Sequence, residues 1–148
     1  MFDKPTIGLE EARAIVDAAL AEANKKPECP VSIAVVDGGG ELVCSARMNG
    51  AYPLFMRVAL NKAYTAALLL KDTTEFAKRS SDMNVDVSSW GDPRLTFIDG
   101  GFTIKKPSDQ YIPASTKTGT VIGGIGVSGR AAVEDAVIAK AGLKAIKM

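Results

Sequence analysis

The sequence predicts an α/β fold of the α+β type, with a five-stranded, mainly antiparallel sheet that carries helices on both faces. Two strand patterns, at residues 31–37 and 41–48, follow each other directly and are joined by a triple glycine, as in a hairpin. Long helical patterns stand at both ends of the chain and in its middle. A chain of 148 residues with 47% apolar residues is typical of one globular domain, here residues 1–148.

Four segments have the apolar spacing of helices. The first is expected over 9–25, where Glu10 and Glu11 occupy the first turn and their charges interact favourably with the helix dipole. The second is expected over 52–70, with Pro53 at its first position and many alanines that let other elements pack closely. A short helix should begin at about Thr73. The last is expected over 131–146, with an inner face formed by Val133, Val137, Ile138, Ala141 and Ala145.

The strands are expected at 31–37, 41–48, 95–98, 102–104 and 120–127, in segments rich in β-branched and aromatic residues. A turn at Gly38-Gly39-Gly40 would place Cys44 opposite Ala34, with Cys29 well beyond it along the strand. A disulfide between these two cysteines is therefore not expected. Together with the absence of a basic, apolar leader after Met1, this favours a cytoplasmic protein.

Composition excludes several classes of function. The net charge of +1 provides no broad basic surface for nucleic acid or for a membrane, and no segment has the apolar length of a spanning helix. The chain contains no histidine, and its two cysteines are separated, so neither a metal site nor a histidine-dependent catalytic triad is expected.

The run Val121-Ile-Gly-Gly-Ile-Gly-Val-Ser-Gly129 is the most informative local feature. Glycine inside a strand marks a bend or the close approach of another group. Gly124 and Gly126 thus indicate either a neighbouring helix packed directly on the strand or contact with a ligand, and the two interpretations are compatible.

Candidate binding residues accompany this strand. Lys62 shares its helical face with alanines that should be core, so it is either a snorkelling surface residue or a charge held in a pocket for an anion. Thr65 lies one turn further and would bond the same ligand or its own helix backbone. Arg47 ends the second strand. Trp90, in the poorly patterned region 80–117, would cover a pocket or lie at a subunit contact.

Four blocks resemble the GlcG/HbpS-like family, which includes the C-terminal domain of PduO-type proteins. The blocks are Pro30–Gly40, Ala46–Ala51, Asn61–Ala67 and Ile122–Gly129, the last followed by Glu134 and Asp135. The resemblance implies a profilin-like five-stranded fold and a homo-oligomer of up to eight chains. It also implies haem as a cofactor, since some members bind haem and some are described as degrading it, whereas many others are encoded among catabolic genes.

The chain departs from the family pattern at Asn49, where aspartate is frequent, and in Gly100–Ile104, which matches a family block only partly. Without histidine, a haem iron would need Tyr, Met, Cys, Lys or a hydroxyl as its axial ligand.

The favoured hypothesis is a small-ligand-binding protein for haem or another tetrapyrrole, with haem turnover, whose ligand site comprises Arg47, Lys62, Thr65, Gly124 and Gly126. The alternative is a catabolic enzyme that holds a small organic acid or carbonyl compound with Arg47 and Lys62. A third hypothesis is an accessory subunit without catalysis.

Overall fold

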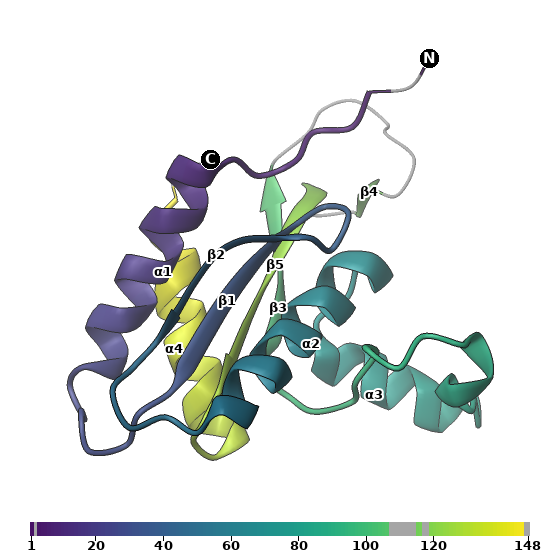
Figure 1. The fold of residues 1–148 in the computed structure, drawn as a ribbon. Helices are drawn as coiled ribbons and strands as arrows, with labels where there is room; N and C mark the ends of the chain where they lie inside the picture. Colours follow the sequence, from purple (N-terminus) through teal and green to yellow (C-terminus); the bar gives the residue numbers. More distant parts are fainter. Residues whose placement is uncertain (2, 107–114, 117–118, 147–148) are drawn as a thin grey trace.

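Ten short elements follow one another in the computed structural model, which describes residues 1, 3–106, 115–116 and 119–146 (Figure 1). In chain order they are α1 (Leu9–Ala23), β1 (Ser32–Asp37), β2 (Leu42–Arg47), α2 (Pro53–Leu69), α3 (Thr73–Asp82), the 3-10 helix η1 (Val87–Trp90), β3 (Gly101–Lys106), β4 (Ser115–Thr116), β5 (Gly119–Ser128) and α4 (Ala132–Leu143). The predicted helices are confirmed, with ends that differ by a few residues. None of the helices in this part of the chain is long and apolar enough to cross a membrane.

The sheet is antiparallel throughout and has the strand order β2-β1-β5-β3. The predicted hairpin of β1 and β2 is confirmed, and Asp37 closes its turn by accepting hydrogen bonds from the backbone N–H groups of Gly39 and Glu41. Its register differs by one residue from the expectation, because a bulge between Val35 and Val36 places Cys44 opposite Val35. Both cysteines are free.

The expectation of five full strands was wrong at residues 95–98. These residues form no strand, because Thr65 of α2 accepts the backbone N–H of Thr96 at 3.0 Å and holds the segment against the helix. Four strands make up the continuous sheet. The two-residue β4 lies off this path and pairs only with the first residues of β5.

Helices cover both faces of the sheet, with α1 and α4 on one face and α2 on the other (Figure 1). The main core lies between the sheet and the α1–α4 layer, where Ile33, Ile125 and Ile138 are fully or almost fully buried. On the α2 face the packing is closer, because β5 presents glycine. A Cβ atom at Gly124 or Gly126 would overlap the backbone of Ala63 or Ala59, respectively, in α2.

The inner face of α4 differs from the predicted one. Val133 and Val137 are 77% and 52% exposed, while the buried positions are Asp135, Ile138, Ala139 and Gly142. The helix is rotated in this way because Asp135 has an ionic partner inside the molecule. Two valines that hydropathy alone assigned to the core therefore face outward.

Candidate functional site

A buried ion pair joins three layers of the fold. The Lys62 ammonium of α2 donates to the carbonyl oxygen of Val127 in β5 at 2.7 Å and lies 3.4 Å from Oδ2 of Asp135 in α4. Both charged side chains are only 2% exposed. The other carboxylate oxygen of Asp135 accepts the backbone N–H of Arg130 at 3.0 Å, just before α4 begins. Lys62 is thus a buried charge with partners inside the protein.

Burial shifts both partners of this pair toward their neutral forms. Removal from water lowers the pKa of the Lys62 ammonium and raises the pKa of the Asp135 carboxyl. The attraction between the two groups opposes both shifts. Loss of either side chain would leave the other charge buried with weaker compensation, which makes the pair sensitive to substitution.

The residues beside Lys62 anchor a loop. Thr65 is fully buried and donates to the Asn61 carbonyl oxygen at 2.8 Å while it accepts from Thr96. The Tyr64 hydroxyl is hydrogen-bonded to Asp92, and the guanidinium of Arg94 lies 4.0 Å from the centre of the Tyr64 ring. Burial raises the pKa of the Tyr64 phenol. Consecutive residues of α2 therefore hold the segment 92–96 in place.

The five predicted site residues do not gather at any of the cavities that the described residues form. Arg47 is exposed at the end of β2 and, within the described part of the chain, has no ion pair or side-chain hydrogen bond. Gly124 and Gly126 are covered by α2, which confirms the close approach of a helix. None of the five lines the cavities described below. Ligand contact through these residues stays a prediction.

A large surface groove lies instead between α3 and α4, over the edge strand β3. Its volume is about 850 Å³, and we call it the α3–α4 groove. Its lining comprises Asp72, Thr74, Glu75, Lys78, Asp99, Phe102, Ala132, Val133, Ala136, Val137, Lys140 and Leu143. The outward valines of α4 thus form one apolar wall, and the Lys140 ammonium lies 5.6 Å from the centre of the Phe102 ring.

Sequence reasoning missed this groove because it placed Val133 and Val137 in the core. The signal that was available is the position of Asp135 relative to Ile138, Ala139 and Gly142. These four residues have the i, i+3, i+4, i+7 spacing of a single helical face. Once Asp135 is recognised as the partner of Lys62, this face must be the inner one, and the valines belong to another.

Two further cavities are smaller than the α3–α4 groove. One of about 620 Å³, between the N-terminal segment and α1, has Glu10 and Glu11 in its wall. Another, near Arg130 and Lys26, has a volume of only about 180 Å³. Among the described residues, no group of three or more metal-ligating side chains is assembled.

Comparison with known proteins identifies the family. Residues 7–144 match the family described as haem degrading protein HbpS-like. The chain belongs to the HbpS-like family. Protein GlcG of Escherichia coli K12 is 33% identical over 128 residues, which cover 86% of this chain and 85% of GlcG.

Solved structures share the fold of the HbpS-like chain. A double mutant of HbpS from Streptomyces reticuli superposes with a TM-score of 0.80 at 30% identity, covering 100% of this chain and 92% of HbpS. The PduOC–haem complex superposes with a TM-score of 0.79 at 23% identity, covering 96% of each chain. At that identity the second similarity concerns the fold alone.

Proposed function

We propose that this protein binds haem or a related tetrapyrrole in the α3–α4 groove, and that it supports turnover of the bound haem. The observation that carries the proposal is the groove itself. Its volume of about 850 Å³ lies within the range of roughly 300–1,000 Å³ that is usual for ligand pockets. Haem binding by PduOC and the description of the HbpS-like family as haem degrading favour this ligand.

The side chains in the groove fit an apolar ring with acidic substituents. Phe102, Val133 and Val137 offer apolar surface, and Lys78 and Lys140 would attract the propionates. The groove also contains three carboxylates: Asp72 accepts the backbone N–H of Thr103 at 2.9 Å, Asp99 accepts from the Thr74 hydroxyl at 3.0 Å, and Glu75 is the third, so the propionates would have to lie beside the lysines.

The iron ligand would be unusual. The chain contains no histidine, and the groove lining contains no Cys, Met or Tyr. Of the side chains in the groove, Glu75, one of the two lysines or the Thr74 hydroxyl would therefore hold the iron. Haem would bring the redox chemistry of its iron, and the protein would contribute the apolar wall, the cations and the axial donor. We expect a haem spectrum without the bands of a six-coordinate bis-histidine or histidine–methionine complex.

Haemin titration tests the proposal. Val137→Glu should weaken haemin binding about tenfold or more, because it places a carboxylate where the groove is apolar and where propionates approach. Leu54→Glu is the matched control, since Leu54 is 62% exposed and lies outside the groove. Absence of a saturable Soret change, or equal affinities for the two variants, would contradict binding at this site.

A second pair of variants tests the cations. Lys140→Gln should weaken haemin binding about two- to fivefold, the scale of an exposed ion pair, whereas Lys144→Gln, at the residue that caps the end of α4, should not. Turnover is tested separately by following the Soret band under air with ascorbate. Protein-bound haem that decays no faster than free haemin would contradict turnover and leave binding unaffected.

A further inference from the structure

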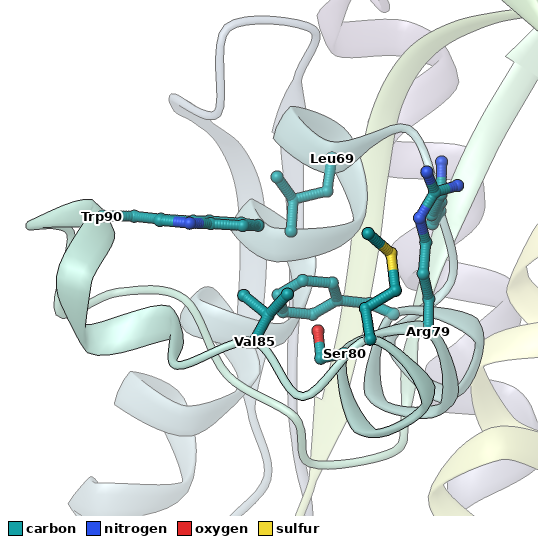
Figure 2. Close-up of a pocket in the computed structure, with 8 residues that line it drawn as sticks. Leu69, Arg79, Ser80, Val85 and Trp90 are labelled. Carbon is teal, nitrogen blue, oxygen red and sulfur yellow. The ribbon is translucent and has the colours of Figure 1, made fainter.

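A second, smaller pocket lies on the other side of α3. It is enclosed by the end of α2, by α3 and by the segment 83–90, and its volume is about 260 Å³ (Figure 2). We call it the aromatic pocket. Its α3 residues are Phe76, Arg79 and Ser80, whereas the α3–α4 groove uses Thr74, Glu75 and Lys78, so the two sites occupy different faces of one helix.

Flat apolar side chains form one end of this pocket. Phe76 is only 3% exposed, and its ring centre lies 5.9 Å from that of Trp90 and 5.1 Å from that of Phe97, on which it stacks. Leu69 and Val85 complete this end. Trp90 is nevertheless 50% exposed, so one large aromatic surface remains open to a ligand.

The position of Trp90 is fixed by local structure. Asp86 caps η1 by accepting the backbone N–H of Ser88 at 3.0 Å and its hydroxyl at 2.6 Å. Gly91 then ends the turn in the left-handed region, with φ of 74°. The indole is thus presented by a defined turn of the backbone.

Cations stand at the other end of the pocket. Figure 2 shows the indole of Trp90 at one end and the guanidinium of Arg79 at the opposite end. Lys71 also lines the pocket. Neither cation forms an ion pair with any residue in the described ranges. An anion that enters the pocket would therefore meet an exposed arginine and a half-buried lysine, neither of which has an ion-pair partner among the described residues.

A serine hydroxyl completes the polar side of the pocket. Ser80 is only 6% exposed, and its hydroxyl points into the pocket between the aromatic end and Arg79 (Figure 2). Across the described part of the chain this hydroxyl has no hydrogen-bond partner. The oxygen is not sealed inside the protein but opens on the pocket, so a ligand oxygen can take the place of water as its hydrogen-bond partner.

We propose that the aromatic pocket binds a small aromatic monocarboxylate such as benzoate. The ring would lie against Trp90 and Phe76, and the carboxylate would accept hydrogen bonds from Arg79 and Ser80, with Lys71 close by. A dry cavity of about 150 Å³ holds benzene. The pocket, at about 260 Å³, has room for one ring and its carboxylate but is much smaller than the α3–α4 groove.

The test uses Trp90, the only tryptophan of the chain, as the reporter. Benzoate is titrated against the intact protein while tryptophan emission is followed, and the same titration of N-acetyltryptophanamide corrects for collisional quenching. We expect a saturable change with a Kd in the micromolar to millimolar range, which is usual for so small a ligand. Benzamide, which has the same shape without the charge, should bind at least about tenfold more weakly.

Variants assign the binding to the pocket. Arg79→Gln should weaken benzoate binding about tenfold or more, and Ser80→Ala should weaken it by a smaller factor. Arg13→Gln removes an exposed cation from α1 and should change nothing. Calorimetry with benzoate on each variant gives the affinity independently of fluorescence. Equal binding of benzamide, an unaltered affinity in Arg79→Gln, or no saturable signal would overturn the proposal. Haemin affinity should be the same in Arg79→Gln and wild type.

Discussion

The role of Lys62 differs between what its sequence context predicts and what the folded structure shows. In the sequence it is a charged residue among alanines on one helical face, and this pattern predicts either a surface lysine or an anion-binding group. In the folded chain its ammonium is bonded to Val127 and paired with Asp135, more than seventy positions further along. Lys62 therefore connects α2 to β5 and α4, and we expect its substitution to change the free energy of unfolding.

Replacing Lys62 with Met should destabilise the protein by about 3–5 kcal/mol, because Asp135 is left buried without its cation. The free energy of unfolding, measured by urea denaturation, checks this. Lys144→Met, at an exposed position, should change it by no more than about 0.5 kcal/mol. The double variant Lys62→Met with Asp135→Asn should recover part of the loss, since Asn can still accept the Arg130 N–H. Wild-type stability in Lys62→Met would contradict the pairing.

The loss in Lys62→Met should depend on pH. Burial raises the pKa of Asp135 above its usual value of 3.8, and removal of Lys62 takes away the main charge that opposes this shift. The folded state then binds a proton more tightly than the unfolded state does. Linkage requires the stability of the variant to rise as the pH falls through the folded pKa toward 3.8. As the pH is lowered from neutral to 4, the urea midpoint of Lys62→Met should therefore approach that of the wild type.

At the scale of elements, the contact between α2 and β5 depends on small residues in both. Ala59, Ala63 and Ala67 form one stripe of the helix, and Gly124 and Gly126 lie opposite them in the strand. The two backbones approach so closely that no Cβ atom fits between them at either glycine. This contact keeps Lys62 at the depth where it reaches the Val127 carbonyl oxygen.

Gly126→Ala should lower the free energy of unfolding by about 1–3 kcal/mol, the usual cost of overpacking, because the new methyl group would overlap the Ala59 carbonyl oxygen. Gly39→Ala is the matched control: there a Cβ atom makes only an ordinary contact, with Asp37, and the backbone is unstrained. Urea denaturation compares the two variants. Equal midpoints would show that the glycine at position 126 is incidental.

At the scale of the whole molecule, apolar side chains remain on the surface of a single chain. Trp90, Phe97 and Ile98 are 50%, 44% and 52% exposed, and all belong to the segment that follows α3. Val133 and Val137 are exposed in the α3–α4 groove. Apolar surface of this kind is frequent at ligand sites and at contacts between subunits.

We expect the protein to form a homo-oligomer, because association through Phe97 and Ile98, which line neither proposed ligand site, would remove their apolar surface from water. Multi-angle light scattering at micromolar protein concentration measures the mass directly. Ile98→Lys should shift the distribution toward smaller species, whereas Arg13→Gln, on α1, should not. The mass of one chain across the concentration range would contradict the expectation.

The sequence by itself determined the local elements and the family. The hairpin, the four helices and the glycine strand depend on periodicity and turn residues within a few positions of each other, so local patterns suffice to predict them. The glycines at positions 124 and 126 likewise predicted that a neighbouring element packs closely on this strand. The four blocks that resemble the GlcG/HbpS-like family lie within the residues that match it.

Only the tertiary structure decided which faces meet. The partner of Lys62, the rotation of α4 and the fate of residues 95–98 all depend on contacts between residues that are distant in the chain. A hydrophobic pattern predicts which residues share one face of a helix. Whether a charged residue on that face can be buried depends on the partner that another element places opposite it. For the same reason the two cavities flanking α3 became visible only when α2, α4 and the segment 83–90 were placed around it.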